Sequence, residues 1–290
     1  MTDAIALDAG KLIGPWRTPR NQNNSTPGSI HDDATAQRLG FRGGTVAGNI
    51  HFEMLAPVLL KALGPRWFER GSLSIEFKYA AQDKEQVRGI VNLPPEGAQD
   101  AQVDVLIEHS NGETVGLGTA SVGDPTEKTW LGAKDLSKYD MGEYEILRDV
   151  RPGDVLVDQE SVTSQTLADG RNKVNIEPMD WYVAKSPWGA PIVTPTLLVR
   201  SLVAYTPLLR ERQVRGVGLY GAIEIRNLNG PVFVGETYRL GGEVVARGQS
   251  PRSEYFWFES HLDDASGKRA AEMLMQLRFM KGSGDLARAR

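Results

Sequence analysis

The chain contains no cysteine and only four histidines among its 290 residues. The absence of cysteine excludes disulfides, thiolate nucleophiles and cysteine-ligated metals together, and it fits a reducing compartment. The histidines are dispersed, and none shows a paired spacing such as H-x-x-x-H, so we predict no metal site. They are His31, His51, His109 and His261.

Basic clusters and long apolar runs are missing as well. The net charge is −4 and the pI about 5.7, and Lys and Arg form no run longer than scattered pairs. Nucleic acid and anionic membranes are therefore not expected partners. No charged-then-apolar leader is visible, and no apolar run approaches about 18 residues. We expect a soluble, cytoplasmic protein without membrane contact.

One architecture occurs twice along the chain. Val46 corresponds to Val193 at an offset of 147 residues, and Glu76 corresponds to Glu224 at an offset of 148. Each unit is predicted to be a helix followed by several alternating strands of an antiparallel sheet. Because the segment 123–145 is polar and interrupted by Gly and Pro, we predict two domains that meet there. The predicted domains are residues 1–135 and 136–290.

The helix of each unit is predicted from its apolar residues. In the first unit, apolar residues recur at helical spacing from Ile50 to Leu63. In the second unit, the stretch from Leu197 to Leu209 is apolar enough to form an equivalent, largely buried helix. A sheet wrapped around one central helix satisfies both patterns.

A family resemblance is carried by the stretch "IHDDATAQRLGFRGGTVAG", residues 30–48, and by "DVRPGDVL", residues 149–156. These stretches resemble the MaoC-like family, which includes (R)-specific enoyl-CoA hydratases. The resemblance implies an α+β, double hotdog fold, in which two antiparallel sheets, each wrapped around a central helix, are fused in one chain. It also implies that no cofactor is needed.

The resemblance places the catalytic groups in the first unit. His31 matches the family histidine, Asp32 is its predicted acid–base partner, and the Gly48 amide is the predicted donor to the enolate oxygen. The family aspartate has no carboxylate counterpart here, and Asn24 is the nearest candidate. Asp32 has an alternative role as the cap of a helix from residue 34 to 39, and Gly48 as a site of close packing.

The same alignment predicts residues that bind the substrate. Asn49 and His51 are expected at the mouth of the pocket, and Glu53 is a further candidate acid or base. In the second unit Pro195 occupies the position of Gly48 and has no N–H to offer. We therefore predict a non-catalytic second unit in which Trp181 and Tyr182 help to wall an acyl tunnel.

The predicted function is that of a MaoC-like hydro-lyase. Its substrate would be a small molecule, an enoyl or 3-hydroxyacyl thioester or a related compound, with CoA or a carrier protein as the thioester handle. Three alternatives stay open: a hotdog thioesterase that uses Asp32 or Glu53, a binding protein that has lost its chemistry, and an isomerase or cyclase on the same pocket. Two units in one chain predict a monomer or a homodimer.

Overall fold

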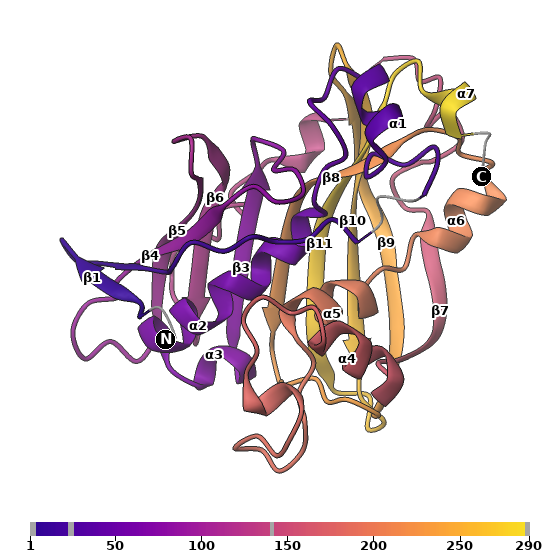
Figure 1. Ribbon diagram of the computed structural model, residues 1–290. Helices are drawn as coiled ribbons and strands as arrows, with labels where there is room; N and C mark the ends of the chain where they lie inside the picture. Colours follow the sequence, from indigo (N-terminus) through magenta and orange to yellow (C-terminus); the bar gives the residue numbers. More distant parts are fainter. Residues whose placement is uncertain (1–3, 23–25, 140–141, 288–290) are drawn as a thin grey trace.

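The computed structural model describes residues 4–22, 26–139 and 142–287, and it is built around one large antiparallel sheet (Figure 1). The sheet has eleven strands in the order β1-β2-β4-β5-β6-β3-β8-β11-β10-β9-β7. The strands are β1 (Ala6–Asp8), β2 (Lys11–Ile13), β3 (Gly71–Phe77), β4 (Val87–Asn92), β5 (Ala101–His109), β6 (Thr114–Val122), β7 (Val155–Val162), β8 (Gly218–Asn227), β9 (Thr237–Gln249), β10 (Ser253–Asp263) and β11 (Arg269–Met280).

Helices α2 to α5 lie in front of this sheet, whereas α1, α6 and α7 lie towards one end of it (Figure 1). The α-helices are α1 (Asp33–Arg38), α2 (Phe52–Leu63), α3 (Arg66–Glu69), α4 (Gln165–Asn172), α5 (Pro195–Ser201), α6 (Thr206–Glu211) and α7 (Gly284–Ala287). The 3-10 helices are η1 (Gly48–His51), η2 (Leu136–Lys138) and η3 (Asp180–Tyr182).

The predicted pair of sheets forms a single sheet, because the central strands of the two halves pair with each other. Strand β3 pairs with β8, and Ile75 lies directly opposite Ile223, the residue 148 positions further on. Pairing these two edges gives each backbone group along them a partner and leaves no open edge in the middle of the molecule. The expectation of two separate sheets is therefore wrong in this detail.

The predicted second helix is also divided. The apolar stretch from Leu197 to Leu209 forms α5 and then, after a break, α6. Pro207 lies in the first turn of α6 and has no N–H for a bond to the preceding turn. A continuous helix through this residue would be disrupted, so a new helix begins there instead.

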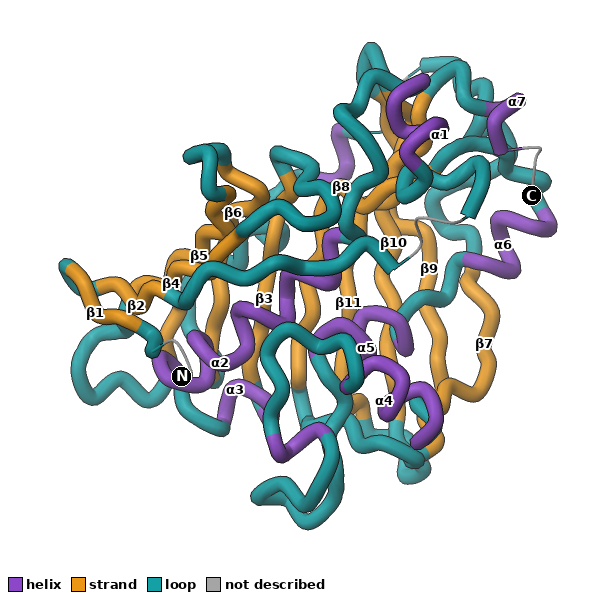
Figure 2. Tube along the Cα trace, in the orientation of Figure 1, coloured by secondary structure: helices purple, strands orange, loops and turns teal. Residues whose placement is uncertain are grey.

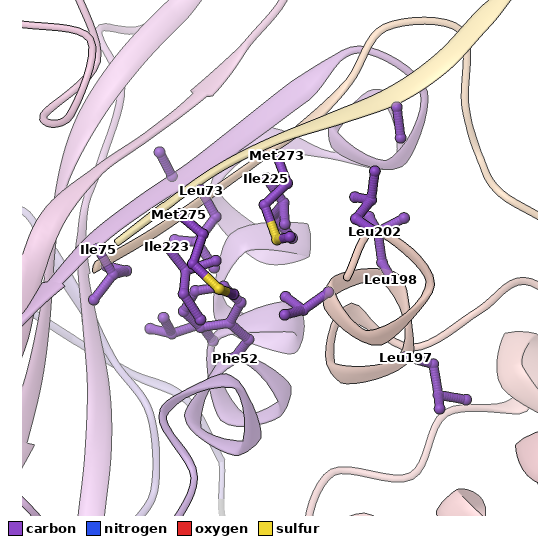
Figure 3. Close-up of a cluster of buried hydrophobic side chains, with 14 of the residues drawn as sticks. Phe52, Leu73, Ile75, Leu197, Leu198, Leu202, Ile223, Ile225, Met273 and Met275 are labelled. Carbon is purple, nitrogen blue, oxygen red and sulfur yellow. The ribbon is translucent and has the colours of Figure 1, made fainter. Parts of the chain in front are cut away.

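The core fills the space between the helices and the sheet. Its largest hydrophobic cluster contains residues from both halves of the chain, so the domain boundary at 135/136 is not marked by a division of the core. Figure 3 shows side chains of α2 and α5 next to those of strands β3, β8 and β11. The labelled members are Phe52, Leu73, Ile75, Leu197, Leu198, Leu202, Ile223, Ile225, Met273 and Met275.

The segment between β2 and α1 crosses from the first half of the molecule to the second (Figure 2). Near the far end of this segment Ile30, together with Ala36 of the following helix α1, is buried against Val217, just before β8. Apolar burial therefore fixes the loop that carries the predicted site residues, although this loop contains little regular structure.

Candidate active site

A cavity of about 830 Å³ opens where the two central strands separate. The β3–β8 ladder ends at the pair Glu76 and Ala222. Beyond this pair, β3 follows β6 and β8 follows β11, so the strand ends splay apart. Both halves line the space that results. Wall residues include His31, Thr45, Ala47, Gly48, His51, Phe77, Lys78 and Tyr79 from the first half and Tyr205, Gly218, Tyr220, Gly221, Arg252 and Arg278 from the second.

His31 lies in this wall, and the backbone of Thr45 fixes its ring. Nδ1 of His31 is 2.7 Å from the Thr45 carbonyl oxygen. Because a carbonyl only accepts hydrogen bonds, Nδ1 carries the proton of the neutral ring and Nε2 carries the lone pair. The backbone of residue 44 lies so close to that of His31 that only glycine fits there, since a Cβ at this position would lie 2.2 Å from the His31 carbonyl oxygen.

The helix start that borders the cavity has no side-chain cap. Ala47 precedes η1 and offers no capping side chain. Within the described residues, no acceptor pairs with the backbone N–H of Ala47, Gly48 or Asn49. Because η1 continues directly into α2, these amides lie at the positive end of a longer helix. Developing negative charge is favoured at such a place.

Packing gives Gly48 a second role. A Cβ at this position would lie 2.7 Å from two atoms of the Phe77 ring, which is closer than real Cβ atoms approach. The alternative role predicted for Gly48, close packing, therefore applies whatever chemistry the amide performs.

The corresponding helix start in the second half is closed. Thr194 caps α5 by accepting a hydrogen bond from the Leu197 amide, and Pro195 follows at the position of Gly48. The space at this helix start has a volume of only about 10 Å³, and Trp67 and Phe68 belong to its wall. This is at the lower limit of what one water molecule needs.

His51 belongs to the cavity wall although only 1% of its surface is exposed. Its Nδ1 is buried without a hydrogen-bond partner among the described residues. Burial, together with the charge of His109, lowers the pKa of His51 to about 4. The ring is therefore neutral at ordinary pH.

The structure does not bring Asp32 into the cavity wall. Its carboxylate caps α1, where Oδ2 accepts hydrogen bonds from the Thr35 amide at 2.9 Å and the Thr35 hydroxyl at 2.7 Å. These bonds lower the pKa of Asp32. The neighbouring Asp33 accepts a hydrogen bond from the Gly44 amide at 2.7 Å and so holds the loop that positions His31.

The other polar candidates of the first half face elsewhere. Asn24 lies outside the described residues. Asn49 exchanges hydrogen bonds with Thr196 of α5 and is not part of the wall. Glu53 is fully buried in a bidentate ion pair with Arg171 of α4. Burial raises the pKa of the Glu53 carboxyl, and Arg171 opposes this rise.

Trp181 and Tyr182 lie away from the cavity wall. Trp181 packs edge-on against Phe68 of α3, with ring centroids 5.9 Å apart, and Tyr182 is buried close by. Neither residue belongs to the wall of the cavity, and Asn172 of α4 holds the backbone of Tyr182 by donating a hydrogen bond to its carbonyl oxygen at 3.0 Å. The expectation that they wall the cavity is wrong for this reason.

The second half contributes residues to the cavity that were not predicted from the sequence. Tyr205 and Tyr220 line the cavity, and burial raises the pKa of both, so both keep their protons. Among the described residues no Asp or Glu lines the cavity, whereas Lys78, Arg252 and Arg278 do. No motif marks these positions, because the splay of the strands brings them together.

Within the described ranges, no three His, Asp or Glu side chains gather in a way that could hold a metal ion. Within the same ranges, no helix combines the length and the apolar character needed to cross a bilayer.

No protein-family model and no curated protein sequence matches this chain. Solved structures do. A protein from Chloroflexus aurantiacus J-10-fl, described as a MaoC domain dehydratase, aligns over 94% of this chain and 96% of its own with a TM-score of 0.65 and 12% identity. A conserved hypothetical protein from Mycobacterium tuberculosis with a double hotdog fold aligns over 94% and 97%, with a TM-score of 0.58 and 13% identity.

The chain has the double hotdog fold. A further MaoC-like dehydratase aligns over 94% of this chain and all of its own, with a TM-score of 0.54 and 16% identity. The predicted resemblance to MaoC-like dehydratases is therefore confirmed at the level of the fold. At these identities, activity has to be argued from the cavity itself.

Proposed function

We propose that this double hotdog protein is a hydro-lyase that adds water to an enoyl thioester or removes it from a 3-hydroxyacyl thioester. The chemistry is assigned to residues 1–135, and residues 136–290 complete the cavity. The observation that carries the proposal is that His31, with a fixed tautomer, and the uncapped helix start at Gly48 border one cavity.

One histidine can perform both proton transfers. Nε2 of His31 accepts a proton from water as the water oxygen bonds to Cβ of the enoyl group. The π electrons move to the thioester oxygen, and the Gly48 N–H stabilises the resulting enolate. The imidazolium then returns the proton to Cα, which restores the carbonyl and the neutral ring. Dehydration follows the same steps in reverse.

Hydrolysis of the thioester is less well supported than hydration. A carboxylate that activates water against the carbonyl was predicted at Asp32 or Glu53. Asp32 caps α1, and Glu53 is bound to Arg171 away from the wall. A one-histidine hydration, by contrast, needs no carboxylate in the cavity.

A second hollow, of about 470 Å³, adjoins the cavity and shares Arg252 with it. Arg38 and Lys281 also line it, together with Asp285. We assign this basic hollow to the phosphates of the thioester handle, in CoA or a carrier protein. Neutralising Arg38, Arg252 and Lys281 to Gln is expected to raise KM for a CoA thioester and to leave KM for the phosphate-free N-acetylcysteamine thioester unchanged. An equal change in both would contradict this assignment.

The experiment that tests the function follows the enoyl band of crotonyl-CoA and longer trans-2-enoyl-CoAs, with a thiol reagent in a parallel sample. We expect the band to disappear without thiol release, and His31→Ala to slow this by about 10²–10⁴-fold. Asp32→Asn is the matched control, since it changes the next residue outside the wall. Thiol release would show hydrolysis, and an unchanged band at every chain length would refute the hydro-lyase.

A further inference from the structure

The two helix starts differ at the position of His51. The entries to both helices have the same backbone pattern: Val46 N–H donates to Ala81 at 2.8 Å, and Val193 N–H donates to Val232 at 3.0 Å. Val46 and Val193 are 147 residues apart, and the same offset places Leu198 at the position of His51. Leu198 is 4% exposed. An apolar side chain therefore suffices for packing at this place, and a buried imidazole without a partner on Nδ1 costs free energy there.

Helix geometry places the ring of His51 beside the open amides. In a 3-10 helix the side chains at i and i+3 eclipse each other, and His51 is three residues after Gly48. Helical side chains also lean towards the N-terminus of the helix, so the ring covers the turn that begins at Gly48. Both residues line the cavity.

The protonation of the ring follows from its surroundings. Nδ1 is buried without a partner, and an orphaned N–H is rarer in proteins than a bare acceptor. The proton of the neutral ring is therefore on Nε2, and the residue belongs to the cavity wall. We propose that His51 donates its Nε2–H to the thioester oxygen of the substrate, together with the Gly48 amide. This inference rests on the proposed function.

The low pKa of His51 supports a donor role rather than an acid–base role. A group with a pKa of about 4 is a poor proton acceptor near neutral pH. As a neutral ring it still donates a hydrogen bond, and burial keeps competing water away from that bond. His31 and His51 thus divide the work: His31 moves the proton, and His51 stabilises the charge on oxygen.

Two variants separate this role from packing. His51→Leu copies the residue that the second half has at this place, and His51→Gln keeps an amide N–H close to the position of Nε2. We expect His51→Leu to lower kcat by about 10²–10³-fold and His51→Gln to recover most of this loss. His261→Gln is the control, since His261 is a histidine of β10 outside the cavity wall.

The direct readout is the infrared carbonyl stretch of bound butyryl-CoA labelled with ¹³C at the thioester carbonyl. Hydrogen bonds to this oxygen lower the frequency, so the wild type and His51→Gln should lie below His51→Leu. Equal frequencies, or an unchanged kcat in His51→Leu while His31→Ala is inactive, would overturn the donor role and leave the hydro-lyase standing. A wild type that neither binds butyryl-CoA nor consumes enoyl-CoA would overturn the proposed function, and the donor role with it.

Discussion

The buried ion pair between Glu53 and Arg171 joins the two halves of the molecule, and its removal gives a sharp test of the structure. Glu53 is on α2 and Arg171 on α4, and their side chains are 0% and 6% exposed. The guanidinium meets the carboxylate through two nitrogens. Replacing Arg171 by Met keeps the apolar volume of the side chain but leaves the carboxylate buried without its cation.

Arg171→Met is expected to lose much unfolding free energy, because the charge of Glu53 remains buried without compensation. Breaking such a pair from one side costs roughly 3–5 kcal/mol of unfolding free energy. For a chain of this length, with about 2.1 cal/mol/K of unfolding entropy per residue, the midpoint should fall by about 5–8 °C. Without Arg171, burial raises the pKa of Glu53 further above its unfolded value. The protonated form is then favoured in the folded state, so stability is retained at low pH and lost as pH rises through the folded pKa.

The assay is urea and thermal unfolding of Arg171→Met at several pH values, alongside Glu53→Leu and the double variant. We expect the double variant to lose less unfolding free energy than the two single variants lose in sum, since it removes both charges. Arg239→Met is the matched control, because Arg239 forms a similar two-nitrogen pair with Asp158 in solvent. If Arg171→Met cost no more than Arg239→Met, or if its cost did not grow with pH, the reasoning would be refuted.

Three further predictions concern the candidate site. Asp32→Asn should lower the unfolding midpoint by weakening the cap of α1 while leaving kcat unchanged, whereas His31→Ala should slow turnover by about 10²–10⁴-fold without such a loss of stability. Gly48→Ala should cost about 1–3 kcal/mol in urea unfolding because of the contact with Phe77, and adding Phe77→Leu should restore part of it. Because the folded pKa of His51 is below its unfolded value, the wild type should lose up to about 3 kcal/mol as pH falls from 6.5 to 4, a loss that His51→Leu should not show.

Periodicity predicted the regular parts of the fold well. The helical spacing from Ile50 to Leu63 corresponds to η1 and α2, and the alternating strands predicted after each helix are present in the antiparallel sheet. The joining of the sheets was not predictable in this way, because apolar alternation fixes which face of a strand is buried but not which edge it pairs. The break before α6 was visible in principle, since Pro207 stands inside the apolar stretch.

The site was less predictable than the fold. A motif gives only the order of residues along the chain, whereas the direction of each side chain decides whether the residue lines the cavity. His31 and Asp32 are adjacent in sequence, yet one reaches the cavity and the other caps α1. Trp181 and Tyr182 had the right chemistry for a tunnel wall, but neither lies in the wall of the cavity. Tyr205 and Tyr220 reach the cavity only because two strands separate, a feature of the sheet that local sequence does not encode.

A doubled unit would give two equal cavities by symmetry, but the two helix starts of this chain differ in the residues and in the space that they offer. Where the first half has an uncapped amide at Gly48, the second has Pro195, which removes the donor. Where the first has His51, the second has Leu198, which packs without a polar group. The cavity at the first helix start has a volume of about 830 Å³, whereas the space at the second has a volume of about 10 Å³. The second half nevertheless supplies Tyr205 and Tyr220 to the open cavity, so the wall of that cavity depends on the fold of both halves.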